Sequence, residues 1–281
     1  MASVTTSQSQ PQAIPVAERL PRPRLRFSFR GHWLTLYAVV IFLFFYLPIL
    51  VLIIYSFNSN RVVGVWEGFS TAWYRELFNN RAIGDAFQVS MWVAVWSTVF
   101  SAILGTLAAL VLERYRFRGR LTLDGVLYLP IIIPDIVMAL STLLFFVIFA
   151  VPLSRNTVLL AHIAFNISFV AVVVRARLAG MDRSLEEAAA DLGASEWVTF
   201  RRVTLPLLAP GIVAGALMAF TLSLDDFVVT FFVSGPGSTT LPVQVYSMIK
   251  FGVTPEVNAL STLMLLGSTV LVIISLAIQR R

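Results

Sequence analysis

The sequence predicts an all-α integral membrane protein with six spanning helices. The chain is 58% hydrophobic and only 13% charged, its mean hydropathy is +0.83, and its apolar residues form six long runs. Soluble domains contain roughly one quarter charged residues, so this composition indicates a protein that folds in lipid. Each run is long enough to cross ~30 Å of hydrocarbon at about 1.5 Å per residue. The spans are expected at residues 33–55, 86–112, 126–153, 157–174, 203–233 and 257–278.

The first thirty residues differ from the rest of the chain. Residues 1–30 are rich in Ser, Gln, Pro and Thr and then in Arg, which predicts a disordered, Arg-rich cytoplasmic segment. The run 33–55 has 23 residues without a charge, which is longer than the roughly 7–15-residue core of a signal peptide. We therefore assign it to a membrane helix and take residues 31–281 as one transmembrane domain.

Basic residues in alternate loops predict the orientation, because loops rich in Lys and Arg stay in the cytoplasm. The N-terminus, the loops 112–126 and 175–202, and the C-terminus together hold sixteen basic residues, whereas the other segments hold five. Both termini are therefore expected in the cytoplasm, as is the long connection 175–206. The outer loops 56–85 and 234–256 have the length to receive a soluble partner, although Trp66 and Trp73 are equally typical of a membrane interface.

The residue inventory excludes several kinds of chemistry. There is no cysteine, which rules out disulfides and thiol catalysis, and the two histidines are too few for a multi-histidine metal site. The single lysine, Lys250, lies between Ile249 and Phe251, so a G-x-x-x-x-G-K-[ST] phosphate loop is absent. Dispersed basic residues argue against nucleic acid as a partner. We predict no catalytic residue, no metal site and no cofactor bound by this chain.

A short helix is predicted in the connection 175–206. Ser184 and Glu187 have the spacing of a capping box, in which the serine oxygen accepts from the first turn and the glutamate reaches back to the cap amide. Gly193 is free to take the left-handed conformation that ends a helix. The apolar residues between these signals fall on one face at helical spacing, and they are Leu185, Ala188, Ala189 and Leu192.

A second short helix is expected to start at Ser195 and Glu196 and to end at Leu205 and Pro206, because proline tolerates only a turn or a helix start there. It carries Trp197 and Phe200 on one face. Two interpretations fit the whole connection. It is either an amphipathic hairpin on the inner leaflet, with its arginines at the lipid headgroups, or a compact element with two aromatic anchors that docks in a groove of another protein.

Three features of this connection have the spacing of a known signature. Glu187-Ala188-Ala189, then Gly193, then Val203-Thr204-Leu205-Pro206 resemble the E-A-A, G, I-x-L-P pattern of permease subunits of binding-protein-dependent ABC importers, with valine in place of the commoner isoleucine. The resemblance implies the type I importer permease fold. It also implies that this connection is the coupling loop that docks onto an ATPase subunit.

A second similarity covers most of the chain from about residue 33. The matching segments resemble the second permease of bacterial putrescine/spermidine importers, and they are residues 55–59, 221–227, 232–237, 240–242 and 252–260. The resemblance implies import of polyamines across the bacterial cytoplasmic (inner) membrane. It implies as partners two copies of an ABC ATPase that bind ATP and Mg²⁺, a second permease subunit, an external substrate-binding protein and membrane lipid.

Acidic residues in the apolar runs are candidates for a substrate pathway. A carboxylate at the bilayer centre costs roughly 2.5–3.5 kcal/mol, so acids there usually line a cavity. Asp225 and Asp226 are placed to attract a polycation, but residues 204–224 alone can span, which would leave both acids at the outer interface. Asp135 follows Pro130 and Pro134, a spacing that breaks helical hydrogen bonding and could make an unwound segment beside the path. Alternatively, residues 136–153 span the membrane unaided, which would leave Asp135 at the cytoplasmic rim.

Other polar and aromatic pairs lie four residues apart and share a helix face. His162 and Asn166 fit an interhelical hydrogen bond better than a binding site. Trp92 and Trp96 could offer cation–π faces to an ammonium group, although packing or lipid contact explains them better.

The alternative function is an ion-gradient-driven secondary transporter of small organic cations, with the aspartates as proton or sodium sites. A membrane-embedded enzyme is less compatible with the sequence, because H-E-x-x-H and nucleophile-elbow motifs are absent.

Overall fold

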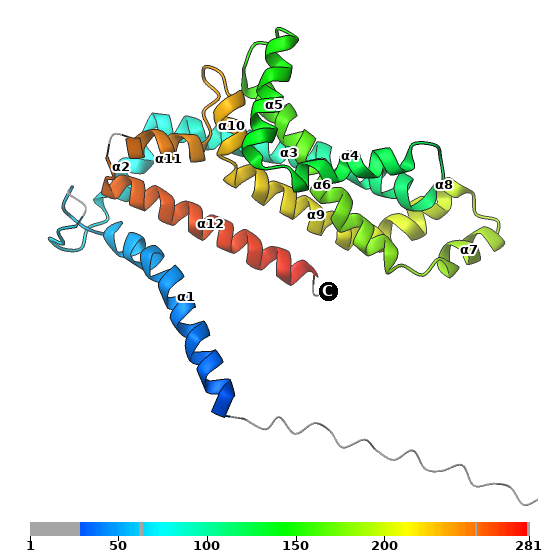
Figure 1. Cartoon of the computed structure of the whole chain (residues 1–281), viewed down its shortest axis with the longest axis horizontal. Helices are drawn as coiled ribbons and strands as arrows, with labels where there is room; N and C mark the ends of the chain where they lie inside the picture. Colours follow the sequence, from blue (N-terminus) through cyan, green and yellow to red (C-terminus); the bar gives the residue numbers. More distant parts are fainter. Residues whose placement is uncertain (1–28, 62–63, 251, 280–281) are drawn as a thin grey trace, which may run out of the picture. The chain divides into compact units, whose positions relative to one another are not determined.

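The computed structural model describes residues 29–61, 64–250 and 252–279, which form helices, their connecting loops and one isolated bridge between Asn58 and Phe69. The predicted all-α class is therefore confirmed for this part of the chain (Figure 1). The helices are α1 (Phe29–Tyr55), α2 (Ala72–Asn79), α3 (Arg81–Arg114), α4 (Arg120–Ile132), α5 (Asp135–Ile148), α6 (Arg155–Ala179), α7 (Ser184–Asp191), α8 (Glu196–Thr199), the π-turn η1 (Phe200–Thr204), α9 (Leu205–Asp225), α10 (Val228–Val233), α11 (Leu241–Lys250) and α12 (Pro255–Gln279).

The chain divides into two compact units, residues 1–48 and 49–281. The first unit holds most of α1, and the predicted disorder of residues 1–30 lies outside the described residues except at Phe29 and Arg30, which are helical. The second unit holds all the other helices and both candidate sites. Five described helical segments are long and apolar enough to cross a membrane, or six if the bent pair α4 and α5 counts as one span.

The third predicted span, residues 126–153, is not a continuous helix. It divides at Ile133 and Pro134 into α4 and α5, whose axes differ by 114°. Pro134 has no N–H and disfavours the helical conformation of the preceding residue, so Ile133 is extended with ψ 135°. The prediction of a proline break before Asp135 is confirmed at Pro134, whereas Pro130 lies inside α4.

The fifth predicted span, residues 203–233, is also divided. Helix α9 ends at Asp225, Asp226 has an extended backbone with ψ 125°, and the short helix α10 follows. The Asp226 carboxylate accepts hydrogen bonds from the N–H groups of Val229 and Thr230 at 3.3 and 2.8 Å. These bonds satisfy the first amides of α10 and explain why the helix restarts at this point.

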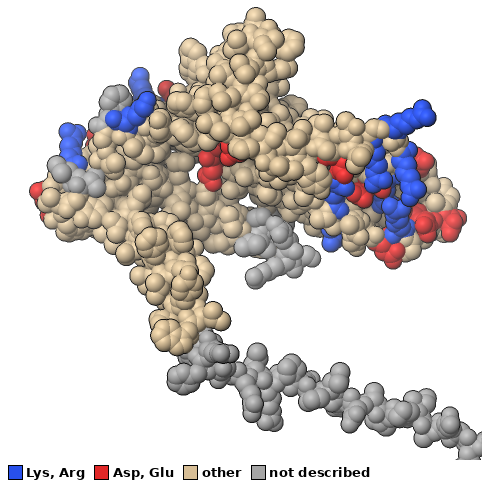
Figure 2. Space-filling model, in the orientation of Figure 1, with Lys and Arg blue, Asp and Glu red and all other residues tan. Residues whose placement is uncertain are grey.

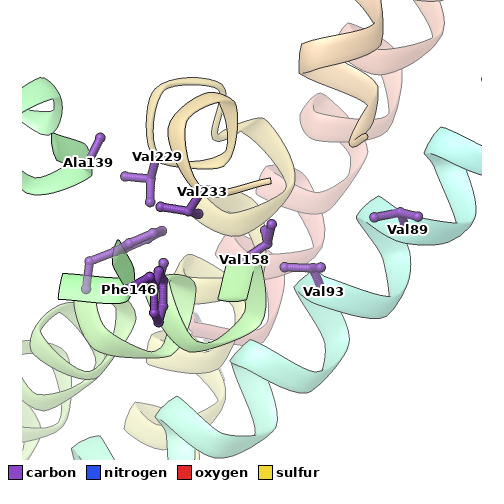
Figure 3. Close-up of a cluster of buried hydrophobic side chains, with 9 residues drawn as sticks. Val89, Val93, Ala139, Phe146, Val158, Val229 and Val233 are labelled. Carbon is purple, nitrogen blue, oxygen red and sulfur yellow. The ribbon is translucent and has the colours of Figure 1, made fainter. Parts of the chain in front are cut away.

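Helices α3, α6 and α9 pack against one another and form the centre of the second unit. Glycines allow this close approach, because a Cβ on Gly105 of α3 would lie 2.8 Å from the Val170 Cβ of α6, and one on Gly211 of α9 would lie 2.8 Å from the Arg177 Cβ. Figure 3 shows a neighbouring cluster, in which Val229 and Val233 of α10 lie between Ala139 of α5 and Val158 of α6. Small residues at helix contacts are typical of membrane bundles.

Contacts between distant loops fall at two ends of the second unit. At one end, Asn80 donates a hydrogen bond to Glu256 at 2.9 Å, so the predicted outer loops 56–85 and 234–256 adjoin. At the other end, Arg114 pairs with Glu186 at 2.6 Å, so the loops 112–126 and 175–202 adjoin. Loops that the basic-residue count assigns to one side therefore lie together.

Candidate functional site

The connection between α6 and α9 contains helix α7, which starts differently from the prediction. The cap residue of α7 is Arg183, and it makes no side-chain capping bond. Instead, Asp182 Oδ1 accepts a hydrogen bond from the Ser184 N–H at 2.9 Å. Hydrogen bonds from the backbone and side chain of Ser184 lower the pKa of the Asp182 carboxyl. The predicted capping box of Ser184 and Glu187 is therefore wrong, because Asp182 takes the amide that the box would have used.

Gly193 ends α7 as predicted. Its φ is +80°, in the left-handed region, and its N–H donates to the Ala190 carbonyl at 2.9 Å. The next amide, that of Ala194, donates back to the Ala189 carbonyl at 3.0 Å. Both bonds satisfy carbonyl groups at the helix end. Glycine is favoured here for its backbone conformation alone, because a Cβ would meet nothing within 4 Å.

The second predicted helix does not stop at Leu205 and Pro206. Helix α8 continues through the π-turn η1 into α9, so residues 196–225 form one uninterrupted helix. The wider turn explains how proline is accommodated, because the Leu205 N–H donates to the Phe200 carbonyl five residues back. Pro206, which lacks an N–H, then lies at the start of α9 where proline is tolerated.

Apolar side chains on α7 and α8 have no cover within the described chain. Neither helix buries a single residue, and the exposed fractions are 48% for Leu185, 90% for Leu192 and 68% for Trp197. The rings of Trp197 and Phe200 lie 5.7 Å apart and form a pair. An apolar surface rimmed by charged residues is typical of a protein-interaction site.

Glu186 fixes α7 to the rest of the protein, and sequence reasoning did not identify it. Its carboxylate accepts from Arg114 at 2.6 and 2.7 Å and from the Thr204 hydroxyl at 2.6 Å. It thereby joins α7 to the end of α3 and to η1. The side chain of Glu187, the signature glutamate, is exposed and makes no hydrogen bond or ion pair with the residues that the structure describes. No sequence spacing signals this difference, because Arg114 lies 72 residues before Glu186.

A second ion-pair group lies beside the first. Arg175 of α6 pairs with Glu113 of α3 at 2.9 Å and with Asp124 of α4. It also lies 5.9 Å from the ring of Tyr128. Figure 2 shows acidic and basic side chains gathered over the end of the second unit that carries α7 and α8, next to a large surface without charges. The α7–α8 segment, residues 184–199, is thus held by charged groups at its base while its apolar side chains stay exposed.

We expect Gly193→Val to loosen the α7–α8 segment. A β-branched residue at φ +80° is strained by about 1–2 kcal/mol, so hydrogen–deuterium exchange of residues 184–199 should be roughly tenfold faster. Gly193→Asn is the matched control, since asparagine tolerates this conformation and should change exchange little. Equal exchange in both variants and the unmodified protein would contradict a conformational role for Gly193.

The acidic candidates surround one cavity of about 330 Å³ in the second unit. Asp135 at the start of α5 and Asp225 and Asp226 at the end of α9 all line it, although they come from two helix breaks ninety residues apart in the sequence. The remaining wall is apolar and aromatic, and it comprises Pro130, Met138, Phe165, Phe169, Thr221, Leu222, Phe227, Val228 and Val229.

The three carboxylates differ in their surroundings. Asp225 is exposed and accepts only from the Ser268 hydroxyl of α12, at 3.2 Å, among the described residues. The Asp135 side chain is exposed and makes no hydrogen bond or ion pair with any described residue. The side chain of Asp226 is only 12% exposed and lies 3.3 Å from the Nε2 atom of His162. The cavity thus combines two accessible carboxylates with one that is already engaged.

The remaining sequence candidates lie elsewhere. His162 makes hydrogen bonds to α9 and α10 as predicted, whereas the buried amide of Asn166 has no hydrogen-bond partner among the described residues. The ring of Trp92 is covered by Arg155 at 4.1 Å, and Trp96 contacts Phe100. Neither tryptophan lines the cavity. In the described part of the chain, no three His, Asp or Glu side chains gather into a metal-binding group.

Comparison with known proteins gives consistent results. Residues 101–281 match the family described as "Binding-protein-dependent transport system inner membrane component". The chain is 46% identical over 251 residues to the "Spermidine/putrescine transport system permease protein PotC" of Escherichia coli (strain K12), which covers 89% of this chain and 94% of the relative. It is 47% identical over 243 residues to the "Putrescine transport system permease protein PotI" of the same strain, which covers 84% of this chain and 86% of the relative.

A solved structure shares the fold. A chain of a bacterial ABC transporter involved in the import of the acidic polysaccharide alginate superposes with a TM-score of 0.72 at 18% identity, covering 90% of this chain and 95% of that one. At this identity the likeness concerns the fold alone.

Proposed function

Because the chain belongs to the family of binding-protein-dependent transport system inner membrane components, we propose that this ATP-driven importer permease moves polyamines, such as putrescine or spermidine, into the cell. The chain is a transport subunit and not an enzyme, since ATP hydrolysis in such importers belongs to a separate subunit. The observation that carries the choice of substrate is the cavity lined by three carboxylates.

The cavity suits a polyamine in both charge and shape. A polyamine has an ammonium group at each end of a flexible apolar chain. Asp225 and Asp135 offer accessible carboxylates, and Phe165, Phe169 and Phe227 offer ring faces that attract cations and cover methylene groups. The volume of about 330 Å³ lies within the usual range for small-ligand sites. We propose that substrate crosses through this cavity.

We further propose a type I importer arrangement with six spans and both termini in the cytoplasm of a bacterial inner membrane. The bent pair α4 and α5 would count as the third span, and the sixteen basic residues on one set of segments support this orientation. The apolar side chains of α7 and α8 would then project into the cytoplasm, where lipid does not cover them.

The proposed partners follow from this arrangement. Leu192, Trp197 and the free Glu187 would dock on an ABC ATPase, two copies of which bind ATP and Mg²⁺. A second permease subunit would complete the pathway. An external substrate-binding protein would contact the outer loops 56–85 and 234–256, which adjoin through Asn80 and Glu256. An ion-driven transporter of organic cations, the alternative function, has no use for a docking segment of this kind.

Uptake by the purified complex in proteoliposomes tests the substrate and its path. We expect uptake of labelled putrescine or spermidine to require ATP, and Asp225→Asn to lower its rate about ten- to hundredfold, since a hydrogen bond to a charged group contributes roughly 1.5–3 kcal/mol. Asp225→Glu, which keeps the carboxylate at the same position, is the matched control and should retain most of the uptake.

Two results would contradict the proposal. Uptake that continues without ATP but collapses with the ion gradient would favour the secondary transporter. Unchanged uptake in both Asp225→Asn and Asp135→Asn would remove the cavity from the substrate path.

A further inference from the structure

A buried polar group joins four helices behind the cavity. His162 of α6 has no exposed surface, and its Nδ1 atom lies 2.7 Å from the Ser223 Oγ of α9. Ser223 accepts in turn from the Ser97 hydroxyl of α3 at 3.0 Å. The other ring nitrogen, Nε2, faces α10, where it lies 3.0 Å from Thr230 Oγ1 and 3.3 Å from Asp226 Oδ2. His162 therefore connects the central helices to the break between α9 and α10 at Asp226.

One of the two carboxylate oxygens of Asp226, Oδ2, is saturated by these and neighbouring groups. Its Oδ2 atom accepts from the Thr230 N–H and hydroxyl, each at 2.8 Å, and faces His162 as well. Its Oδ1 atom accepts from the Val229 N–H at 3.3 Å. A carboxylate oxygen offers about two lone-pair sites, so Oδ2 has no capacity left for an ammonium group. Among the described residues, the Asp225 carboxylate has a single partner, the Ser268 hydroxyl.

The hydrogen bonds of this buried network can all be made with a single proton on the His162 ring. If Ser97 donates to Ser223 and Ser223 donates to Nδ1, each hydroxyl uses its one proton. The remaining ring proton then lies on Nε2 and is shared by Thr230 Oγ1 and Asp226 Oδ2. Each of the side chains Ser97, Ser223, His162, Thr230 and Asp226 is then hydrogen-bonded within this network, which is the condition under which a buried network holds its members in one geometry.

We propose that the two adjacent carboxylates have different roles: Asp225 contacts the ammonium group of the substrate, while His162 holds Asp226 as a positioning residue. Asp226 keeps the break between α9 and α10 in the form that turns Asp225 toward the cavity. This inference rests on the proposed function, because it assigns roles within the same substrate path.

A double-mutant cycle tests the proposal. In the reconstituted complex, we expect His162→Leu to lower putrescine uptake about tenfold, because Asp226 and Ser223 lose a buried partner. Asp226→Asn should lower uptake only about threefold, since its amide oxygen can still accept from Thr230 and His162. The double variant, His162→Leu with Asp226→Asn, should be no slower than Asp226→Asn alone, because the buried carboxylate that loses the His162 N–H is no longer there.

Two further variants separate positioning from simple loss of structure. His162→Gln can still accept from Ser223 and donate to Asp226, and it should retain uptake within about threefold. Asp225→Asn should lower uptake at least tenfold while leaving the thermal midpoint of the complex unchanged, and His162→Leu should lower uptake little further in the Asp225→Asn background, because His162 acts through Asp225. Asp226→Asn as damaging as Asp225→Asn, with no relief in the double variant, would overturn the proposal.

The same double-mutant cycle, measured by thermal unfolding, distinguishes failure of the proposed substrate path from failure of the positioning contact. If Asp225→Asn and Asp135→Asn leave uptake unchanged, the proposed substrate path is wrong. Coupling between His162 and Asp226 in the thermal midpoints would still support the positioning contact, and additive midpoints would overturn it.

Discussion

Glu186→Arg is expected to abolish ATP-driven uptake by separating α7 from the rest of the permease. The side chains of Glu186 and Arg114 are only about one fifth exposed, at 18% and 21%, and the substitution places two cations together where three short contacts now exist. Losing hydrogen bonds to a charged group costs roughly 1.5–3 kcal/mol each, so the docked position of α7 should fall more than a hundredfold in population. The measurement is uptake together with co-purification of the ATPase.

Two variants control this experiment. Adding Arg114→Glu to Glu186→Arg restores opposite charges and should recover part of the uptake. Glu187→Arg changes the exposed neighbour, so it should weaken ATPase binding while leaving hydrogen exchange in α7 unchanged. Full uptake by Glu186→Arg would show that the contact with Arg114 does not position α7.

Gly105→Leu is expected to prevent stable folding. A Cβ at this position would lie 2.8 Å from the Val170 Cβ and 2.9 Å from the Ile167 carbonyl oxygen, so even the first added atom requires α3 and α6 to move apart. Overpacking a core costs roughly 1–3 kcal/mol and sometimes more, and leucine adds three further carbons to that clash. We expect the folded yield in detergent, measured by size-exclusion chromatography, to fall at least tenfold.

Gly267→Leu in α12 is the matched control, because a Cβ there meets nothing within 4 Å. Its yield and thermal midpoint should match those of the unmodified chain. A normal yield for Gly105→Leu would contradict the close approach of α3 and α6.

The sequence predicted the helical class and most of the helix positions because lipid imposes long uncharged runs that are easy to recognise. The run 157–174 lies inside α6, and the run 257–278 lies inside α12. The break before Asp135 was also predictable, because proline removes an amide donor and restricts its neighbour. The break at Asp226 was not, because it depends on a carboxylate that replaces helical hydrogen bonds, and aspartate in an apolar run gives no such indication by itself.

Local sequence patterns also predicted part of the candidate sites. The signature from Glu187 to Pro206 drew attention to the segment that contains α7 and α8, and Gly193 has the predicted backbone conformation. Two predicted patterns were overridden by other local interactions: Asp182, only two residues before Ser184, displaced the capping box, and a π-turn carried the helix past Pro206. The role of Glu186 depends on Arg114 of another helix, and the helical periodicity of the sequence does not indicate such a pairing.

The continuous helix from Glu196 to Asp225 has a mechanical consequence. Thirty residues at about 1.5 Å each make a helix of roughly 45 Å, with Trp197 near one end and Asp225 at the other. The π-turn at residues 200–204 and Pro210 lie within it, but the backbone stays helical past both and first leaves the helical conformation at Asp226. A displacement of the Trp197 end is therefore expected to move Asp225 relative to α10 and so to alter the acidic cavity.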